Sequence, residues 1–432
     1  MTETAAAEAA ENPSRGTDRS LWHNPDFLKF WVGESASLLG TQVTVLAVPL
    51  TAIYALHSTD QEVGLLRFVQ LVPYILLSLI FGVLVDRVRR REVMIWSNVA
   101  RMILIALIPT LYWLGGLNMA LLLVITCVAG IASVLFDLCW MAYVPTLVRD
   151  PKHYVEAQAK MGISSSTAEV AGPGLAGLLV GALTAPFALL VDAGSYAVSL
   201  VALMMIRTKE KKPARPARRH LPTELKDGLR WVFHNRILRW LALIGFCCNF
   251  SMNTVWTMFL LHGTRDLHMP SQTIGGIFAT ASVGGLIGAM LSRRVIGWFP
   301  LGPTYLIAQS GLLLGPALIV FAAGPSWLRI GMFVLSFFTT YLGLGIANVI
   351  IVSLRQTTTP QSMMGRMTAC FRMLLFGGGA LGGLCAGLLS GWLGAWHALI
   401  VASVASGAVV VGLILSPVSR LRELPPPVLE AA

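Results

Sequence analysis

Twelve apolar segments, each long enough to cross a lipid bilayer, constrain the fold of this chain more than any other feature. A membrane-spanning helix needs about 20 predominantly apolar residues. The segments run at 28–56, 64–85, 93–115, 118–144, 157–183, 186–206, 238–262, 272–296, 301–323, 327–353, 367–391 and 395–416. Only 12% of the 432 residues are charged and 55% are hydrophobic, whereas soluble domains are about 25% charged. We therefore predict an all-α polytopic membrane protein with twelve transmembrane helices.

The longest polar interruption, RTKEKKPARPARRH at 207–220, divides these segments into two groups of six. We predict a tail at 1–26, a six-helix bundle at 27–206, a linker at 207–236, a second six-helix bundle at 237–416 and a tail at 417–432. The Lys, Arg and Pro content of 207–220 is typical of a flexible linker, and 221–236 could form an amphipathic helix on the membrane surface. Residues 1–20 have no apolar run, so we expect a disordered tail and not a cleavable signal.

The basic residues lie almost entirely on one side of the predicted membrane. The assignment leaves Arg67, Arg265 and Arg329 on the outer side and Arg101 within a span, with the others in the remaining loops, linker and tails. Because loops rich in Lys and Arg stay in the cytoplasm, we predict that both termini are cytoplasmic and that the linker faces anionic lipid. This distribution accounts for the net charge of +11 without a nucleic-acid partner.

The sequence has neither a nucleotide-binding motif nor a candidate metal site. It contains no G-x-x-x-x-G-K-[ST] pattern, and its six cysteines fall inside predicted spans without metal-ligand spacing. No convergent set of His, Ser and Cys residues indicates an enzyme. We expect no cofactor, so a transport activity would be driven by an ion gradient or by the gradient of the substrate itself.

The loop GVLVDRVRRR, from Gly82 to Arg91, carries one acid and four arginines between two apolar segments. It resembles the G-x-x-x-D-R-x-G-R-R loop between the second and third helices of the major facilitator superfamily, at Gly82, Asp86, Arg87, Arg90 and Arg91, with Arg89 in place of a glycine. The resemblance implies a conformational latch. We expect Asp86 and its neighbouring arginines to bind the cytoplasmic end of the eleventh helix, near Arg366 and Arg372, when the cavity opens outward.

A second motif, AEVAGPGLAG at 168–177, lies in the fifth segment. It resembles the G-x-x-x-G-P-x-x-G-G motif of exporters in the same superfamily at Gly172, Pro173 and Gly177, with Ala168 and Ala176 in place of glycines. A proline inside a helix removes a backbone hydrogen bond and bends the helix. The resemblance therefore predicts export, with a bent helix shaping a gate between the two halves.

Three further stretches together resemble one bacterial branch of this superfamily, which holds enterobactin-type siderophore exporters and macrolide efflux proteins. They are SLRQTTTPQSMMGRMTACFR at 353–372, FDLCWMAYVPTLV at 136–148 and LVDAGSYAVS at 190–199. The resemblance extends from about residue 27 to 416. It implies two six-helix pseudo-repeats, with the first, fourth, seventh and tenth helices lining a central cavity.

Small residues recur four positions apart on several segments, a spacing that lets helices approach closely. GPGLAGLLVG at 172–181 has an expected counterpart in GGGALGGLCAG at 377–387, as parallel six-helix repeats would require. The small faces are formed by Ala168, Gly172 and Ala176, by Gly379, Gly383 and Gly387, and by Gly284, Gly285 and Gly288. We predict that they form the sliding interface between the halves; simple packing of glycine-rich helices is the alternative.

Few ionisable residues lie inside the predicted spans, and proton coupling needs an acid that can load and release a proton there. The cavity-lining positions implied by the resemblance make Glu34 and Asp137 the leading candidates and Glu169 the next. A structural ion pair of Glu34 or Asp137 with Arg101 is the alternative. We predict structural roles for Arg101 and Asp192 because their helices are peripheral in the family.

Polar and aromatic residues share faces of the cavity-lining segments. The substrate-cavity candidates are Thr41, Trp140, Asn249, Asn253, Trp256, Tyr341 and Asn348. Polar groups amid aromatic rings suit an amphipathic organic molecule, and interhelical hydrogen bonds are the alternative role for them.

These observations predict a monomeric exporter that moves a hydrophobic or amphipathic small molecule by alternating access, in exchange for protons. The substrate would be a drug, an antibiotic or a siderophore-like compound, which links the chain to multidrug resistance. Two alternatives stay open. One is a facilitator or importer of the same fold without proton coupling, and the other is a membrane sensor that does not transport.

Overall fold

The computed structural model describes residues 21–85, 88–148, 153–208, 210 and 221–426, and all regular structure in these ranges is helical. The latch residues Asp86 and Arg87 lie outside the described residues. The long helices are α2 (Pro25–Leu50), α3 (Asp60–Val85), α4 (Arg90–Trp113), α5 (Met119–Leu147), α6 (Tyr154–Leu183), α7 (Ala185–Met205), α9 (Arg236–Leu261), α10 (Ser271–Trp298), α11 (Leu301–Leu314), α13 (Ser326–Thr357), α14 (Gln361–Leu393) and α15 (Ala395–Leu415). The shorter elements are η1 (Leu21–His23), η2 (Thr51–Ala55), α8 (Leu221–His234), η4 (His262–Asp266), α12 (Ala317–Val320) and η5 (Pro417–Arg420).

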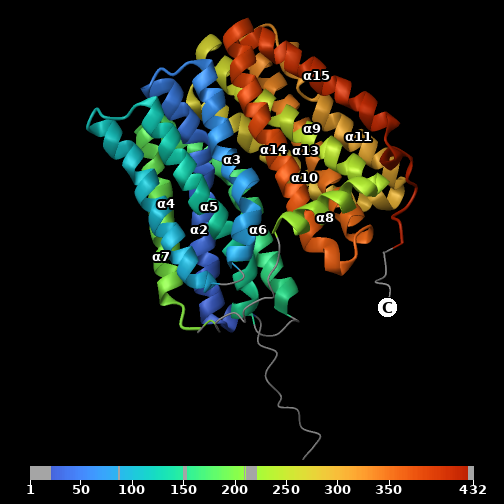
Figure 1. Cartoon of the computed structure of the whole chain (residues 1–432). Helices are drawn as coiled ribbons and strands as arrows, with labels where there is room; N and C mark the ends of the chain where they lie inside the picture. Colours follow the sequence, from blue (N-terminus) through green and yellow to red (C-terminus); the bar gives the residue numbers. More distant parts are fainter. Residues whose placement is uncertain (1–20, 86–87, 149–152, 209, 211–220, 427–432) are drawn as a thin grey trace, which may run out of the picture.

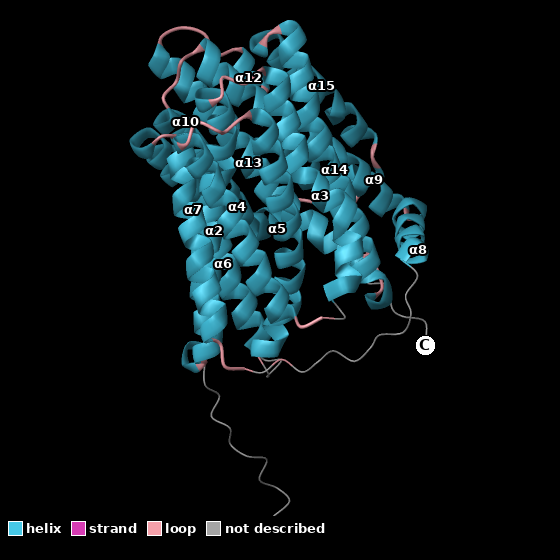
Figure 2. Ribbon diagram, turned by 60° about the vertical axis from the view of Figure 1, so that its left-hand side comes forward, coloured by secondary structure: helices cyan, strands magenta, loops and turns pink. Residues whose placement is uncertain are grey.

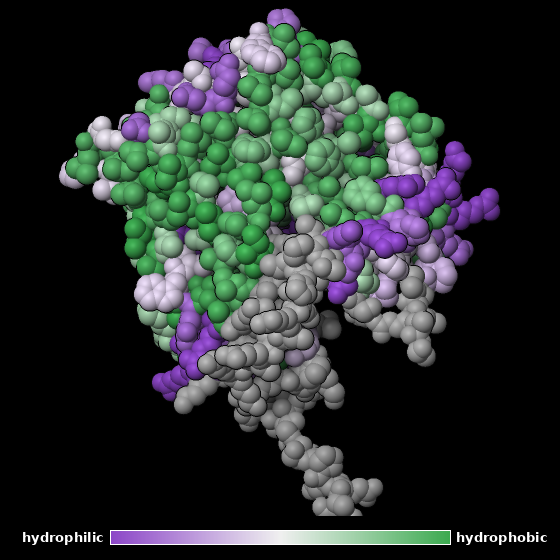
Figure 3. Space-filling model, in the orientation of Figure 1, coloured by the Kyte–Doolittle hydropathy of each residue, from purple (hydrophilic) through white to green (hydrophobic). Residues whose placement is uncertain are grey.

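These helices confirm the predicted all-α polytopic fold. Within the described ranges, eleven helices are long and apolar enough to cross a membrane, and α3, which is 26 residues long, lies in the same bundle. Most of the helices α2 to α7 pack mainly on one another, as α9 to α15 do, whereas α3 packs mainly on α14. The two groups form bundles that lie side by side (Figure 1). On the face shown in Figure 3, hydrophobic residues cover the middle of the molecule and hydrophilic residues gather toward its ends.

The ninth predicted span differs from expectation because it is broken into α11 and α12. The break falls at Gly315 and Pro316, where proline cannot donate the backbone hydrogen bond that would continue the helix. At the break the carbonyl oxygen of Gly315 accepts from the Leu318 N–H at 3.0 Å and from the Ser336 hydroxyl on α13 at 2.8 Å. The hydropathy of 301–323 alone does not distinguish a broken span from a continuous one.

The described residues form three apolar cores, and their positions define two ends of the molecule. We call the end that carries Arg207, Thr208 and α8 the linker end, and the opposite end, which carries η2 and η4, the far end (Figure 2). At the far end one core joins both bundles, running for example from Leu46 on α2 to Phe259 on α9. At the linker end each bundle has a core of its own. The two halves are therefore packed together at the far end and separate at the linker end.

Candidate functional site

A cavity of about 490 Å³ lies between the two halves near the middle of the molecule. Helices α2 and α6 line it on one side, and α9, α10 and α13 line it on the other. Trp256 and Phe278 stack with ring centroids 5.3 Å apart in its wall. Glu169 on α6 is the only Asp, Glu, Lys or Arg among its described lining residues. An apolar, aromatic cavity with one carboxylate can hold an amphipathic small molecule.

The structure brings some of the predicted cavity residues to this space and leaves others outside it. Trp256, Tyr341 and Asn348 line the cavity, together with Glu169 and Pro173. The remaining four are absent from its described lining.

Three of these four make hydrogen bonds within the protein instead. Thr41 lies 3.3 Å from the hydroxyl of Tyr196 within the first half. Asn249 donates to the carbonyl oxygen of Gly245 at 3.0 Å, and Asn253 accepts from Arg67 at 3.0 Å. Trp140 has a buried indole nitrogen without an acceptor in the described part of the chain.

Arg67 is a residue whose place the sequence interpretation got wrong. We expected it at the outer membrane surface, but it lies seven residues inside α3, bonded to Gln70 at 3.3 Å and to Asn253 of the second half at 3.2 and 3.0 Å. Its guanidinium also lies 5.1 Å from the ring centroid of Trp256. Asn253 and Trp256, both in the other half, stabilise the guanidinium by a hydrogen bond and a cation–π contact. A hydropathy profile contains no information about such partners. The side chain therefore joins the halves beside the cavity.

Backbone contact between α6 and α10 closes the far side of the cavity. A Cβ placed on Gly275 would lie 2.5 Å from the Pro173 carbonyl oxygen and 2.7 Å from the Gly177 Cα. Ser271 donates from Oγ to the Gly177 carbonyl oxygen at 3.2 Å. Two of the three exporter-motif residues, Pro173 and Gly177, thus lie at the interface between the halves, whereas Gly172 packs against Gln42 of its own half.

A second backbone contact, between α3 and α14, repeats the first. A Cβ on Gly64 would lie 2.6 Å from the Gly387 Cα. Gln61 lies against Gly391 as Gln272 lies against Gly181.

This geometry corrects the register of the expected internal repeat. Because Gly387 corresponds to Gly177, the counterpart of 172–181 is GGLCAGLLSG at 382–391 and not 377–387. Both stretches are dense in glycine, so several registers fit the sequence, and only the contact partners distinguish them. Of the predicted small faces, that of Gly383 and Gly387 lies between the halves, whereas Gly284 and Gly288 pack on α13 within the second half, as Gly172 packs on α2 within the first.

An ionic contact lies beside the α3–α14 interface at the far end. Asp60 at the start of α3 pairs with Arg265 in η4 and accepts a hydrogen bond from Ser390 on α14. Arg265 also donates to the carbonyl oxygen of Ser58. The Asp60 side chain is 12% exposed and that of Arg265 is 34% exposed. We call Asp60, Arg265 and Ser390 the far-end lock, because each contact crosses between the halves.

Two of the three predicted proton-coupling residues, Glu34 and Asp137, lie outside the described lining of the cavity, in the first half. Glu34 is 7% exposed, and one of its carboxylate oxygens is buried without a hydrogen-bond partner among the described residues. Arg101 is within electrostatic range of both Glu34 and Asp137. Its guanidinium lies over the rings of Phe136 and Tyr196, at 3.9 and 4.4 Å from their centroids. Within the described ranges no direct ion pair joins Arg101 to a carboxylate.

Asp137 connects this buried group to the second half. Its carboxylate accepts a hydrogen bond from the Tyr74 hydroxyl at 2.9 Å, and the Tyr74 ring stacks on Phe376 of α14 with centroids 4.6 Å apart. Arg372, also on α14, lies 5.8 Å from the Phe376 centroid and within electrostatic range of Asp137. Tyr74 thus links Asp137 to the second half.

Asp192 is fully buried at the packed contact between α2 and α7. It accepts hydrogen bonds from Thr44 and, at 3.0 Å, from Ser195. Gly40 packs directly against this pair, because a Cβ there would overlap the Ser195 side chain. The carboxylate therefore faces neither the cavity nor the other half.

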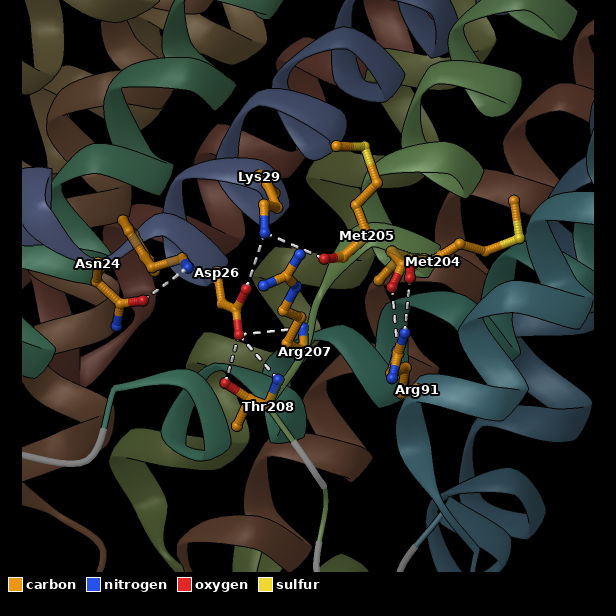
Figure 4. Close-up of polar contacts among 10 residues, drawn as sticks. Asn24, Asp26, Lys29, Arg91, Met204, Met205, Arg207 and Thr208 are labelled. Carbon is orange, nitrogen blue, oxygen red and sulfur yellow. Dashed lines mark hydrogen bonds and ion pairs between the residues drawn. The ribbon is translucent and has the colours of Figure 1, made fainter.

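The described arginines of the latch loop bind within their own half. Arg91 donates to the carbonyl oxygens of Leu203 and Met204, at 3.0 Å each, at the end of α7 (Figure 4). Arg90 donates to the carbonyl oxygen of Ala142 at 3.1 Å. The Glu210 carboxylate accepts from the backbone N–H groups of both arginines, at 3.1 Å each. It thus acts as a capping acceptor at the N-terminus of α4.

The start of the linker is bound to α2 in the same region. Asp26 accepts from the Arg207 N–H and from the backbone N–H and hydroxyl of Thr208, at 2.7 to 3.1 Å (Figure 4). Of the other latch candidates, Arg366 pairs with Asp227 of α8 at 3.4 Å. A Cβ on Gly82 would meet no atom within 4 Å. The described contacts of Arg90 and Arg91 thus stay within the first half and the start of the linker.

Comparison with known proteins places this geometry in a family. Residues 30–383 match the Major Facilitator Superfamily. The chain is 25% identical to the multidrug efflux pump Tap of Mycolicibacterium fortuitum over 397 residues, covering 89% of this chain and 93% of Tap. It is also 25% identical to the enterobactin exporter EntS of Citrobacter koseri over 427 residues, covering 95% and 96% of the two chains.

Solved structures show the same fold at lower identity. The nucleoside transporter NupG matches with a TM-score of 0.74 and 11% identity, covering 90% of this chain and 98% of that one. A bacterial homologue of the iron transporter ferroportin, in an inward-facing state, matches with a TM-score of 0.65 and 18% identity, covering 91% and 99%. Because the family match extends over residues 30–383, most of its length, this chain belongs to the Major Facilitator Superfamily.

Proposed function

We propose that this protein is a secondary active exporter of hydrophobic or amphipathic small molecules, driven by proton exchange across a bacterial inner membrane. The observation that carries the proposal is the division of the apolar core. The halves share one core at the far end, have separate cores at the linker end, and enclose a cavity between them. This is the arrangement expected of one end state of alternating access.

The orientation follows from charge. The linker end carries most of the basic loop residues, and such loops stay in the cytoplasm. With that assignment the structure is the state in which the cavity faces the cytoplasm, where an exporter collects its substrate. The named activities of Tap and EntS support export, and both relatives cover nearly the whole chain.

The cavity suggests the chemistry of the substrate. Its volume of about 490 Å³ falls in the range of small-molecule sites, and such sites place few polar groups among apolar ones. Trp256, Phe278 and Tyr341 would contact an apolar body, while the exposed Glu169 carboxylate would meet a cationic or hydrogen-bonding group.

Proton coupling would act through Asp137. Protonation would neutralise the carboxylate and would change the hydrogen bond from Tyr74, whose ring stacks on the second half. A proton could thus bias how the halves approach each other at the linker end. Glu34 shares the same buried electrostatic group and would hold the proton at another stage of the cycle.

The first experiment is survival of an efflux-deficient bacterium expressing the protein, across macrolides, dyes and siderophore-like compounds, with and without a protonophore. We expect protection that the protonophore abolishes and that Glu34→Gln and Asp137→Asn each remove. Glu423→Gln is the control, because Glu423 is an exposed carboxylate outside the cavity.

Protection that survives both substitutions and the protonophore would instead favour a facilitator without proton coupling. No protection against any compound, together with failure of introduced cysteines to change accessibility between states, would favour a membrane sensor.

A further inference from the structure

A groove on the side of the molecule adjoins the central cavity between α6 and α10. Its volume is about 500 Å³. Residues of α6 from Ala159 to Ala171 line it together with Leu286 of α10, and we call it the side groove. Ser166, Val170 and Leu286 line both the side groove and the central cavity. Because these three shared residues come from both halves, the groove meets the cavity at the boundary between the halves.

The side groove occupies the part of this boundary that close helix contact leaves open. Near the far end, a Cβ on Gly177 would lie 2.6 Å from the Ser271 carbonyl oxygen, and one on Gly174 would lie 3.4 Å from the Ala279 Cβ. About three helical turns nearer the start of α6, a Cβ on Gly162 would meet no atom within 4 Å. The groove thus begins where the contact between α6 and α10 ends.

The surface of the side groove is uncharged and lies at membrane depth. Its described lining contains no Asp, Glu, Lys, Arg or His. Ile163 is 64% exposed and Leu286 is 38% exposed, on helices long and apolar enough to span a membrane. Met161, between the lining residues of α6, belongs to the linker-end core of the first half. In the orientation proposed above, the groove therefore opens toward the lipid of the cytoplasmic leaflet.

The central cavity adds a single carboxylate to this apolar path. Glu169 lines the cavity directly before Val170, one of the residues that the two spaces share. Its side chain is exposed and accepts a hydrogen bond from Ser165 on the same helix at 3.4 Å. A molecule that passes from the groove into the cavity would move from an uncharged surface to a negative one.

We propose that the side groove is the entrance through which an amphipathic cation reaches the central cavity from the cytoplasmic leaflet of the membrane. This inference rests on the proposed export function and adds the route to it. Transfer of apolar surface out of water is favourable, so amphipathic compounds concentrate in the membrane, and an entrance on the lipid side collects them there. The apolar body would pass between Ile163 and Leu286, and the positive charge would then meet Glu169.

Binding kinetics of tritiated tetraphenylphosphonium, a lipophilic cation, to the full-length protein in nanodiscs test the proposal. An obstructed entrance slows association and dissociation alike and leaves Kd unchanged, because an equilibrium does not depend on the route. Gly162→Phe and Thr167→Phe each place a ring in the side groove, at positions outside the described lining of the central cavity. We expect each variant to keep the wild-type Kd while both rate constants fall about tenfold, within the range over which association rates vary among variants of one interface.

Gly297→Phe is the matched control. Gly297 is an exposed glycine of α10 whose added Cβ would meet no atom within 4 Å, and it is absent from the described lining of both spaces. This variant should keep the wild-type rate constants and Kd.

Wild-type rate constants in both groove variants would mean that the cation enters from water at the linker end, which overturns the entrance but not the proposed export. A changed Kd at an unchanged association rate would place the effect in the binding site and would also overturn the entrance. Failure of the wild type itself to bind tetraphenylphosphonium would contradict the cation site of the proposed function, and the entrance would fall with it.

Discussion

Closure of the far end depends on backbone contact at Gly275, and a single methyl group there should oppose it. In this state a Cβ on Gly275 would lie 2.5 Å from the Pro173 carbonyl oxygen and 2.7 Å from the Gly177 Cα. Both contacting atoms belong to the α6 backbone, so no side-chain rotation can relieve the overlap. The Gly275→Ala substitution therefore requires α6 and α10 to separate, which also weakens the Ser271–Gly177 hydrogen bond.

The size of the effect follows from the cost of overpacking. Extra atoms in a packed interface cost about 1–3 kcal/mol, and about 1.4 kcal/mol corresponds to a tenfold change in an equilibrium constant. The ratio of far-end-closed to far-end-open protein should therefore fall about 5- to 140-fold. Gly276→Ala is the matched control, because a Cβ at the adjacent position meets no atom within 4 Å. Both substitutions change helix propensity alike.

The assay is electron–electron double resonance between spin labels at Leu114 and Trp327. These side chains are 66% and 73% exposed at the far end of the two halves. The six native cysteines would first be replaced. We expect a longer-distance population in Gly275→Ala and the wild-type distribution in Gly276→Ala. Identical distributions for the two variants would refute the reasoning that this backbone contact sets closure.

Three further predictions concern charged residues. Asp60→Asn removes the negative charge that pairs with Arg265 in the far-end lock. Since this pair is partly exposed, we expect the closed state to lose about 1 kcal/mol, which makes the far-end-open population approximately fivefold larger in the same resonance assay. An unchanged population would contradict the lock. Glu169→Gln should weaken export of cationic compounds while sparing uncharged ones, measured as the shift in inhibitory concentration in the efflux-deficient strain, and an equal loss for both would show that Glu169 does not select by charge. If the latch forms when the cavity opens outward, Asp86→Asn should lower the rate of substrate transport measured in proteoliposomes. A normal transport rate would refute that hypothesis.

The sequence predicted the helices well because their signal is local. Apolar runs of bilayer length gave the spans, and the amphipathic pattern of 221–236 anticipated α8. Pro316 lies within an apolar run, so the hydropathy average concealed the break between α11 and α12. The prediction succeeded wherever one stretch of chain contained the whole physical cause.

The candidate site was less predictable because its contacts join distant parts of the chain. Trp256, Tyr341 and Asn348 were expected at the cavity and line it, since each lies on an inward face of a central helix. Arg67 was misplaced because its partner, Asn253, lies 186 residues away. A charged residue near the end of a span is assigned to the surface unless its partner is known. The Asp60–Arg265 pair was not predicted because these two residues also lie far apart in the sequence.

The α6–α10 and α3–α14 contacts have the same backbone packing but differ in the charged residues beside them. Where the α3–α14 side carries Asp60 and Arg67, the corresponding positions of α10 are Ser271 and Phe278. The close packing of glycine backbones therefore closes the far end on both sides, whereas charged groups stabilise it on one side only. Since Gly275 and Asp60 share no contact partner, the effects of Gly275→Ala and Asp60→Asn on the far-end-open population should add as free energies. A double variant that opens no further than Gly275→Ala alone would mean that the two sides cannot close independently.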